Sequence, residues 1–484
     1  MTRTLHAAAV ASIALLTAAC SATQPAGNTT RDTNHQTART TGRTATITID
    51  GDTSEWTGTG AVQARADQHH LYIRFDPDTG LHAIQAAPFT TRILIDADDR
   101  PDTGMPIAGM GVDLAVLLSP PNALGGIGIG SEVMRYNADA MGTSTGHADI
   151  GFFFLPSHAA TSYEARIDRA ALPAQPGRPV RVRVDQTDAD ANTLWSAQAS
   201  TTLPAARVAA PAPTGDIPPN PKDALRVLSL NVLFSSPLQN PDAFRRTLQA
   251  INPDVILFQE WFNTPQTAIQ NWMDTHAGPG WTVIAPNASK GVAVATRAPV
   301  LETIPGPLPG SGPGSGARFV GAVIDAPTGP AIVGSLHLKC CGAADGPEDL
   351  RRIQEAQSIN ATIADARTRH PKAAIAIGGD YNLVGTRTPL ETLAAGLSAN
   401  GDDLQPADAL TIGDAAAVTW VDEKSRFSPG RLDWILFDPA RSTLRRAFTL
   451  DTRRLAPAAL HRLGLDAQDS HATDHLPVVV DLAP

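Results

Sequence analysis

Cysteine is scarce in this chain, which holds only three in 484 residues. Two of them, Cys340 and Cys341, are neighbours in the sequence. Adjacent Cα atoms lie about 3.8 Å apart, below the usual range for a disulfide, so a bond between these two would be strained. We therefore expect buried or partly buried thiols at both positions. Their closeness to His337 also leaves open a site for a soft metal.

Basic residues are outnumbered by acidic ones. Lys and Arg number 38 against 48 Asp and Glu, and the formal net charge is -10. This balance argues against a protein that wraps nucleic acid with a broad basic surface. It does not exclude an enzyme that meets a phosphate group locally through a metal ion. The length of 484 residues favours two folded units joined by a linker.

No apolar run is long enough to span a bilayer. The run Ala7–Leu16 follows Arg3 and predicts a secretory signal. The letters "LTAAC" at its end resemble the cleavage box of bacterial lipoproteins, in which Cys20 becomes the lipidated first residue of the mature chain. A conventional signal peptide with an incidental cysteine is the alternative. We expect a signal peptide over residues 1–20 and an exported protein of the bacterial cell envelope, periplasmic or at the cell surface, with the lipid on Cys20 as its only membrane anchor.

The next two segments differ sharply in pattern. Residues 21–43 are polar, rich in Thr and short of apolar residues, which predicts a disordered tether. Helical periodicity is almost absent from residues 44–202, where short alternating runs are broken by Gly, Pro and Asp. The runs are "ATITIDG", "HLYIRFDPD", "TRILIDADD", "VDLAVLLS", "SYEARIDRAAL" and "RPVRVRVDQ". Many short strands with turns between them predict an all-β sandwich.

Four pieces of this segment carry a resemblance. Taken together, "ITIDGDTSEW", "LYIRFDPD", "ILIDADDRPDTG" and "SYEARIDRAAL" resemble a β-sandwich of the carbohydrate-binding-module-9 type. The resemblance implies that a glycan could bind here, although many relatives act as spacers without a ligand. The acidic turn "DADDRPDTG" has oxygen ligands that suit Ca²⁺, and a solvated loop is the alternative.

A composition change marks the boundary to the second unit. Residues 203–224 are dense in Pro and Ala and predict a semi-rigid linker. Over residues 225–484, strands are expected at "ALRVLSLNVLF", "PDVILFQEW", "KGVAVATRAPV", "PAIVGSLHLK", "KAAIAIGGDYN", "RLDWILF" and "HLPVVVDL", and helices at "PDAFRRTLQAIN" and "PEDLRRIQEAQSINATIADARTR". This pattern suggests two packed sheets flanked by helices. With the linker as boundary, a fragment starting near Pro221 is expected to fold alone.

Polar side chains lie at or just beyond the ends of these strands. They are Asn231, Glu260, His337, Asp380, Asn382, Asp433, Asp474 and His475. Taken singly they have ordinary explanations, such as a strand-end cap for Asn231, a turn aspartate for Asp433 or a surface histidine for His475. Together they are what a phosphoester site with a hard metal needs: carboxylates for Mg²⁺, a base for water, and amide or cationic donors for charge developing on phosphorus.

The order of seven motifs resembles the endonuclease/exonuclease/phosphatase superfamily over about residues 225–482. The motifs are "SLNV", "FQE", "GVAVATRAPV", "SLHL", "GGDYN", "RLDWILF" and "TDHLPVVV". The resemblance implies an α+β protein whose C-terminal domain is a four-layer α/β sandwich of two packed mixed sheets flanked by helices, preceded by the all-β sandwich. It also implies a Mg²⁺ cofactor, or Mn²⁺ in its place, with Glu260 as principal ligand, Asn231 beside it and Asp474 completing the metal shell.

The same resemblance implies catalytic roles. Asp380 would orient or deprotonate the attacking water, and Asn382 would hold the phosphate. His475 would stabilise the pentacovalent state or serve the leaving oxygen, while Asp433 would fix its tautomer. His337 would be a second imidazole at the scissile phosphate.

Departures from the family pattern bear on the substrate. The abasic-site DNA nucleases of the superfamily carry an acidic residue two positions after the first Asn and a tyrosine in mid-chain, where this chain has Leu233 and His337. The histidine in "SLHL" is more like the secreted nucleases and the sphingomyelinases. However, the loop Ile304–Arg318 lacks the aromatic residues with which sphingomyelinases enter membranes. Nuclease, phospholipid phosphodiesterase and phosphomonoesterase activities all stay open.

The sequence thus predicts an exported, lipid-anchored, Mg²⁺-dependent phosphoester hydrolase in which the metal assists the attack of water on phosphorus. Its substrate would be a nucleic acid, a phospholipid head group or a small phosphoester, and we expect a monomer. The alternative is a non-catalytic surface or glycan-binding protein that retains the hydrolase fold. No expected catalytic position is replaced, which favours the enzyme.

Overall fold

A computed structural model describes residues 47–173, 177–204, 213–307, 314 and 316–484, which belong to one compact unit. The predicted signal peptide, Cys20 and the tether lie outside the described residues. So do residues 205–212 of the predicted linker, and residues 308–313 and 315 of the loop Ile304–Arg318. In the described part of the chain, no helix combines the length and the hydropathy needed to cross a bilayer.

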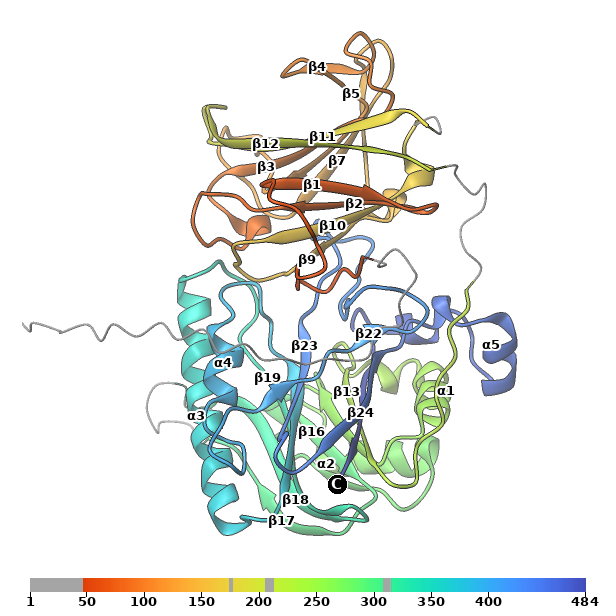
Figure 1. The fold of residues 1–484 in the computed structure, drawn as a ribbon. Helices are drawn as coiled ribbons and strands as arrows, with labels where there is room; N and C mark the ends of the chain where they lie inside the picture. Colours follow the sequence, from red (N-terminus) through yellow and green to blue (C-terminus); the bar gives the residue numbers. More distant parts are fainter. Residues whose placement is uncertain (1–46, 174–176, 205–212, 308–313, 315) are drawn as a thin grey trace, which may run out of the picture. The chain divides into compact units, whose positions relative to one another are not determined.

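The region before the linker is built from two antiparallel sheets (Figure 1). The four-stranded sheet has the order β1 (Val62–Ala66), β2 (His70–Phe75), β10 (Tyr163–Asp168) and β9 (Phe153–Leu155). The six-stranded sheet has the order β12 (Thr193–Thr202), β11 (Pro179–Thr187), β3 (Thr90–Asp96), β6 (Leu114–Leu118), β7 (Ser131–Tyr136) and β8 (Gly142–Thr145). A small hairpin joins β4 (Met105–Ile107) to β5 (Met110–Val112).

These two sheets share one apolar core. Alternate residues of β2, namely Leu71, Ile73 and Phe75, are fully buried and lie in one cluster with Ile93 and Ile95 of β3. Successive side chains of a strand point to opposite faces, so each sheet turns one apolar face inward. The β-rich region predicted from the alternating pattern is therefore present.

The first run assigned to this sandwich lies elsewhere. Residues 47–51 of this run, "ITIDG", are in neither sheet, and Ile49 instead forms an isolated bridge with Ala416 of the second region. Ile47, Ile49 and Trp56 are buried in a cluster that also contains Val418. An alternating pattern reports which side chains are buried, and here the burial comes from both regions, because the cluster also contains Leu155 of the sandwich.

The second region has two mixed sheets. The seven-stranded sheet has the order β15 (Thr282–Ile284), β16 (Ala293–Thr296), β14 (Val255–Gln259), β13 (Leu225–Asn231), β25 (Val478–Ala483), β24 (Thr443–Thr449) and β22 (Leu410–Thr411). The six-stranded sheet has the order β17 (Val300–Ile304), β18 (Arg318–Ala326), β19 (Gly329–His337), β20 (Ala374–Asp380), β23 (Asp433–Phe437) and β21 (Gln405–Pro406).

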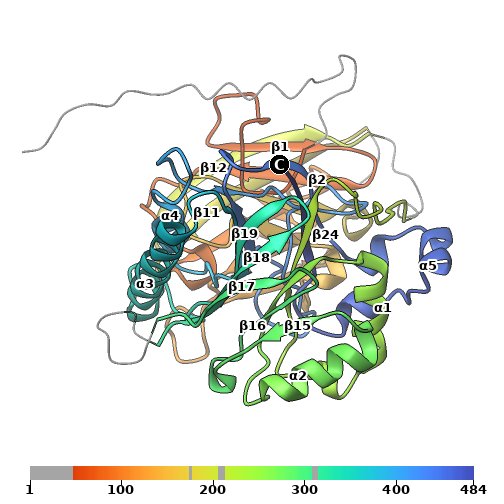
Figure 2. The ribbon, with the colours of Figure 1, turned by 90° about the horizontal axis from the view of Figure 1, so that it is seen from below.

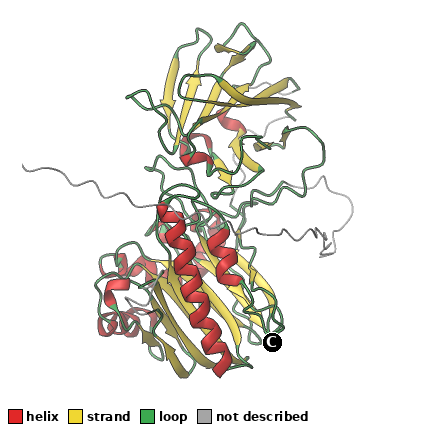
Figure 3. Cartoon of the chain, turned by 90° about the vertical axis from the view of Figure 1, so that its left-hand side faces the viewer, coloured by secondary structure: helices red, strands yellow, loops and turns green. Residues whose placement is uncertain are grey.

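Five α-helices belong to this region: α1 (Pro241–Ile251), α2 (Gln266–Trp272), α3 (Pro347–Arg369), α4 (Thr388–Ala394) and α5 (Pro457–Leu463), all within the described residues. Short 3-10 helices are η1 (Ile84–Ala86), η2 (Ala148–Ile150), η3 (Arg169–Ala171), η4 (Ser236–Leu238), η6 (Ala288–Lys290), η7 (Thr452–Arg454) and η8 (Asp469–His471), and η5 (Met273–Ala277) is a π-helix. Figure 3 shows α3 as the longest helix, lying along the strands.

The helices cover the outer faces of the two sheets. Leu248 of α1 packs in one cluster with Phe258 of the seven-stranded sheet, and Ile359 of α3 packs with Ile375 of the six-stranded sheet. A third cluster, which includes Val480 and Val333, fills the space between the sheets. Figure 2 shows α1 and α2 on one side of the strands and α3 and α4 on the other. The predicted four-layer α/β sandwich is confirmed.

Strand register brings the site together. His337 ends β19 and pairs with Asp380, which ends β20, and Asp380 pairs with Asp433, which begins β23. Because β20 is parallel to β19 and antiparallel to β23, these three residues meet at one edge of the sheet. Asn231 ends β13 in the facing sheet.

Candidate active site

The structure brings all eight predicted site residues together. Glu260, His337, Asp380, Asn382, Asp474 and His475 line one pocket. Asn231 and Asp433 stand behind it, each in hydrogen-bond contact with a lining side chain. Residues from both sheets contribute, so the site lies at one end of the pair of packed sheets, where strands from each sheet end.

Asp380 is the centre of this group and is only 2% exposed. Its Oδ1 accepts the backbone N–H of Asn382 at 2.9 Å, and its Oδ2 accepts Asn382 Nδ2 at 3.0 Å. The same Oδ2 lies 3.4 Å from Asn231 Nδ2, 3.5 Å from His337 Nε2 and 3.8 Å from His475 Nε2. One carboxylate is thus surrounded by two amides and two imidazoles.

His475 and Asp433 form a buried pair. His475 Nδ1 lies 2.8 Å from Asp433 Oδ2, and this contact leaves Nε2 to face Asp380. The hydroxyl oxygen of Thr419 accepts the backbone N–H groups of Leu432 and Asp433, both at 2.9 Å. The two residues predicted to act as a dyad are therefore in direct contact, and the start of β23 is fixed beside them.

The two imidazoles have opposite electrostatic settings. Burial disfavours charge on His475, but the carboxylates of Asp433 and Asp380 outweigh it and raise the pKa of His475 to about 10. Burial, together with the positive charges of Arg318 and His475, holds the pKa of His337 well below its usual range. The surroundings thus favour charge on His475 and disfavour it on His337.

The central carboxyl group is shifted as well. Burial raises the pKa of Asp380 to about 7, a shift that His475 opposes and that Asp433 and Glu260 reinforce. The pocket thus offers a carboxyl group that can exchange a proton, a cationic imidazole and a neutral one.

Two site residues hold unusual backbone conformations. Glu260 has φ +67° and Asn382 has φ +49°, in the left-handed region that non-glycine residues seldom occupy. Glu260 Oε1 accepts Asn231 Nδ2 at 3.2 Å, and its Oε2 accepts the backbone N–H of Phe234 at 3.1 Å. Such conformations persist where the surroundings over-determine them, and they cluster at functional sites.

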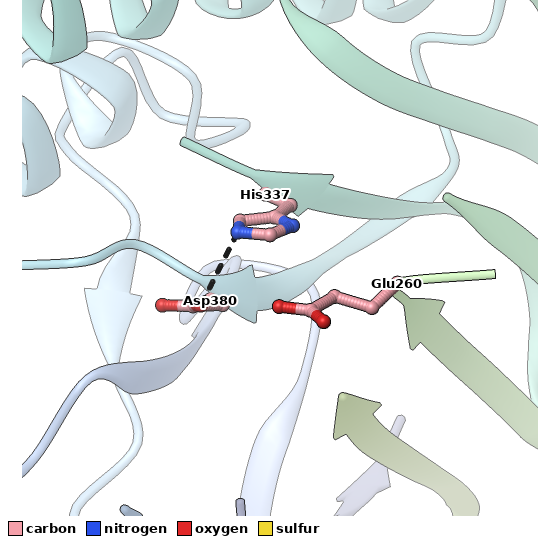
Figure 4. A group of neighbouring side chains, drawn as sticks. All are labelled: Glu260, His337 and Asp380. Atoms are coloured by element: carbon pink, nitrogen blue, oxygen red, sulfur yellow. Dashed lines mark ion pairs between the residues drawn. The ribbon is translucent and has the colours of Figure 1, made fainter. Parts of the chain in front are cut away.

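Glu260, His337 and Asp380 form a group that fits a cation (Figure 4). One potential ligand atom from each lies within 4.8 Å of those of the other two. The charge of Glu260 contributes to the raised pKa of Asp380, and a divalent ion between the two side chains would favour the charged form of Asp380. Two carboxylates with a single imidazole suit Mg²⁺ or Mn²⁺ better than a soft metal.

Two other predicted ligands lie beside this group with their oxygens already engaged. Asp474 Oδ2 accepts the indole N–H of Trp420 at 3.0 Å, and Asn231 Oδ1 accepts the backbone N–H of Leu233 at 3.1 Å. Within the described part of the chain, Asp474 does not belong to the group of close ligand atoms. The metal-binding roles of Asn231 and Asp474 stay predictions.

Cys340 and Cys341 are free thiols on the wall of the pocket. Cys340 is partly buried as expected, whereas Cys341 is exposed, on a backbone with φ +71°. The expectation of burial is therefore wrong for Cys341. Neither thiol joins His337 in a group of potential ligands found among the described residues, so the soft-metal alternative gains no support.

Sequence reasoning missed the segment Thr419–Trp420. Its contacts join the start of β23 to the segment before β25, since the backbone N–H of Leu476 donates to Thr419 O at 2.7 Å and Trp420 pairs with His475 in an isolated bridge. The available signal was the run "AAAVTW", in which Ala416, Val418 and Trp420 alternate as in a half-buried strand.

The pocket has a volume of about 600 Å³, in the usual range for small-molecule sites. Besides the site residues, its walls include Val384, Trp420, Phe427, Ser428 and Leu432 from the second region, and Ala83, Gln85, Ala86, Ile129 and Ser157 from the β-sandwich.

A model of the "Endonuclease/Exonuclease/phosphatase family" matches residues 228–475, just over half of the chain, and the match includes all eight site residues. The chain belongs to this family. Enzymes of the endonuclease/exonuclease/phosphatase family hydrolyse phosphoesters and generally depend on a divalent metal. No curated protein sequence matches the chain.

Several solved structures are similar to about half of this chain. Sphingomyelinase C from Streptomyces griseocarneus is 15% identical, with 53% of this chain and 99% of that chain covered at a TM-score of 0.37. The 3'-5' exonuclease NExo of Neisseria meningitidis is 18% identical, with 54% and 100% covered at a TM-score of 0.38. Beta toxin 275-280 of Staphylococcus aureus is 17% identical, with 53% and 99% covered at a TM-score of 0.35.

Proposed function

We propose that this protein is an exported phosphodiesterase that hydrolyses its substrate with Mg²⁺, or with Mn²⁺ in its place. The observation that carries the proposal is the convergence of Asn231, Asn382, His337 and His475 on the buried carboxylate of Asp380. A structural role alone would not gather two imidazoles and two amides around one buried carboxylate at an open pocket.

The chain's own residues have separable tasks in this reaction. Asp380 takes a proton from, or orients, the attacking water, and Asn382 holds a phosphate oxygen. His475 carries positive charge toward the phosphorus, and Asp433 keeps its Nδ1 proton in place. His337, in which burial disfavours charge, lies 3.5 Å from Asp380 Oδ2 and would be the second imidazole at the phosphate.

The metal would be held by Glu260 and Asp380, with Asn231 and Asp474 beside them. When bound, it supplies positive charge for the phosphate oxygens and acidifies water. We infer Mg²⁺ or Mn²⁺ because the carboxylate oxygens dominate the group. Activity that zinc alone restored would instead favour His337 with Cys340 and Cys341.

The location proposed for this enzyme is the cell envelope, with a lipid on Cys20 as anchor. The mature protein should partition into detergent, and Cys20→Ala should stay unlipidated. A mature N-terminus other than Cys20 would refute the anchor. The glycan-binding role of the β-sandwich is likewise a proposal, supported by the resemblance of its four sequence pieces.

The decisive experiment is a hydrolysis panel with plasmid DNA, RNA, sphingomyelin and soluble phosphomono- and diesters. Turnover of at least one diester is expected with Mg²⁺ or Mn²⁺, with loss in EDTA and recovery when the metal is returned. His475→Ala serves as the matched control, because a contaminating hydrolase would ignore it. Absence of turnover on every substrate would favour the alternative, a non-catalytic surface or glycan-binding protein.

A further inference from the structure

The β-sandwich contributes to the catalytic pocket through separate segments. Ala83, Gln85 and Ala86 come from around η1, Ile129 precedes β7, and Ser157 follows β9. Three stretches that lie far apart in the sequence thus meet at one wall. The other lining residues, among them Glu260 and Asp380, belong to the hydrolase domain.

This wall is fastened to the hydrolase loop 420–431. Gln85 Oε1 accepts the backbone N–H of Ser428 at 2.9 Å, and Ser157 Oγ accepts that of Arg431 at 3.0 Å. Ser131 donates its backbone N–H to Arg426 O at 2.6 Å. Three hydrogen bonds from three sandwich segments to one loop define a fixed surface.

Two glycines allow the close approach. Gly130 has φ +86°, and a Cβ there would lie 2.6 Å from Arg426 Cγ. A Cβ on Gly430 would lie 2.4 Å from Ser157 Oγ. Each side of the contact therefore has a glycine where a residue of the other side approaches closely.

The same loop reaches the catalytic strand ends. Trp420 bridges His475, and the backbone N–H of Val421 donates to Asp474 O at 2.8 Å. The sandwich, the loop and the catalytic histidine are thus joined in one hydrogen-bonded series. The sandwich segments that line the pocket are therefore connected to the site residues by hydrogen bonds.

The chemistry of the pocket favours a substrate with one phosphate and an apolar group. Ile129 is 49% exposed although it is a large apolar residue, and it lines the pocket together with Trp420 and Phe427. None of the described residues that line the pocket is a lysine or an arginine. A polynucleotide needs a cationic track for its successive phosphates, and duplex DNA needs a far wider opening.

We propose that the β-sandwich forms the specificity wall of the catalytic pocket and that this wall selects small phosphodiesters with an apolar substituent over polynucleotides. The proposal rests on the proposed hydrolase function for its substrate chemistry. Ile129 is the apolar contact for the substituent, and Gln85 and Ser157 hold the loop that carries Trp420 and Phe427 in place.

The test compares two substitutions in the full chain. Ile129→Asp places a charge in the wall, and Leu194→Asp does the same at an equally exposed apolar residue of β12 that does not line the pocket (49% and 50% exposed). The measurements are KM and kcat for bis(p-nitrophenyl) phosphate, cleavage of plasmid DNA, and calorimetric binding of diphenyl phosphate. Sphingomyelin in mixed micelles tests whether the apolar group can be that of a lipid.

Ile129→Asp should raise the KM and the dissociation constant about tenfold with kcat little changed, and Leu194→Asp should change neither. The conservative variant Ile129→Leu should keep the wild-type KM and dissociation constant. Sphingomyelin turnover with the same sensitivity would identify a lipid source, and turnover of the soluble diester alone would identify a soluble one. Equal effects of Ile129→Asp and Leu194→Asp on KM would overturn the proposal. A higher kcat/KM for plasmid DNA than for the aryl diester would overturn it as well.

The binding of diphenyl phosphate distinguishes failure of the proposed hydrolase function from failure of the proposed specificity wall. If no phosphoester is hydrolysed but Ile129→Asp weakens the binding of diphenyl phosphate, the wall stands and the hydrolase function fails. If turnover depends on His475 but neither KM nor binding responds to Ile129→Asp, the hydrolase function stands and the wall fails. Absence of both turnover and binding would refute both.

Discussion

At the scale of single residues, the contact between His475 and Asp433 gives a direct prediction. Asp433→Asn would leave the shape of the site intact but remove the charge that holds the Nδ1 proton, at a 2.8 Å contact. We expect turnover to fall about 100-fold or more while KM changes little. The measurement is kcat on the substrate that the panel identifies, with thermal melts to show that the variant is folded.

The double variant provides the control for this pair. His475→Ala should cost about as much as Asp433→Asn, and the double variant should be no slower than the slower single one, because groups that act as a unit are far from additive. Additive losses would show that the two residues act separately. Near-normal turnover of His475→Ala would remove His475 from the mechanism altogether.

A second residue-scale prediction distinguishes the metal ligands. Glu260→Gln keeps the volume but removes one of two carboxylates in the cation group, and should weaken Mn²⁺ binding at least about 100-fold in a calorimetric titration. Asp474→Asn is the matched control, because an amide oxygen can still accept the indole N–H of Trp420. Equal losses in both variants would place Asp474 in the metal shell.

At the scale of secondary-structure elements, the sequence predicts most of the strands whose ends hold the site residues. The strands that end at Asn231, His337 and Asp380 are buried apolar runs, and such runs are readable without a structure. The sequence does not predict strand β18, because "RFVGAVIDA" follows directly on the loop rich in Gly and Pro. It is nevertheless buried over most of its length, between β17 and β19.

The wall of the pocket lay beyond sequence reasoning for a different reason. Gln85 and Ser428 are separated by 343 positions, and their hydrogen bond depends on how two regions pack. No period or motif encodes such a contact, because it involves one polar residue on each side. The candidate site residues are predictable because each one lies within a few positions of the start or end of a strand motif, whereas the wall residues belong to loops and a single 3-10 turn.

Strand pairing in the seven-stranded sheet gives an element-scale prediction. Arg226 of β13 donates through Nε and Nη2 to Asp481 of β25 at 2.7 and 2.8 Å, and both side chains are buried. Nη1 also donates to the carbonyls of Pro218 and Ile251. Asp481→Ala would leave a buried guanidinium without its counter-ion, so the free energy of unfolding should fall by about 3–5 kcal/mol.

An exposed pair of the same chemistry is the control. Arg445 and Asp223 lie 3.3 Å apart with both side chains more than half exposed, so Asp223→Ala should change the free energy of unfolding by less than about 1 kcal/mol. Denaturant unfolding of both variants measures the difference. Similar small changes in the two would mean that Asp481 does not balance Arg226.

At the scale of the whole molecule, the β-sandwich and the hydrolase domain share buried polar contacts. Arg166 of β10 forms an ion pair with Asp414, and these side chains are 2% and 9% exposed. Ile49 and Ala416 are buried in one apolar cluster. A fragment starting near Pro221 would expose that cluster and leave Asp414 without Arg166. Its folding alone stays a prediction, and its pocket would lack the wall that Gln85 and Ser157 support.

The same contact region contains a histidine that should make stability depend on pH. His158 follows β9 and is 7% exposed. Burial, with the positive charges of Arg387 and Arg431, lowers its pKa to about 4. Its unfolded pKa is about 6.5, so between these values the unfolded chain binds more protons than the folded one. The stability from a neutral His158 is therefore fully present above pH 6.5 and is lost as pH falls through 4.

We expect this histidine to account for up to about 3 kcal/mol of unfolding free energy between pH 7 and pH 4. His158→Gln cannot titrate, so its unfolding free energy should fall less steeply over that interval than that of the wild type. His461→Gln, at an exposed position of α5, should keep the wild-type slope. The slopes come from denaturant unfolding at several pH values. Parallel curves for wild type and His158→Gln would mean that the pKa of His158 is the same in the folded and unfolded chain. Burial at the contact between the two domains would then not lower that pKa.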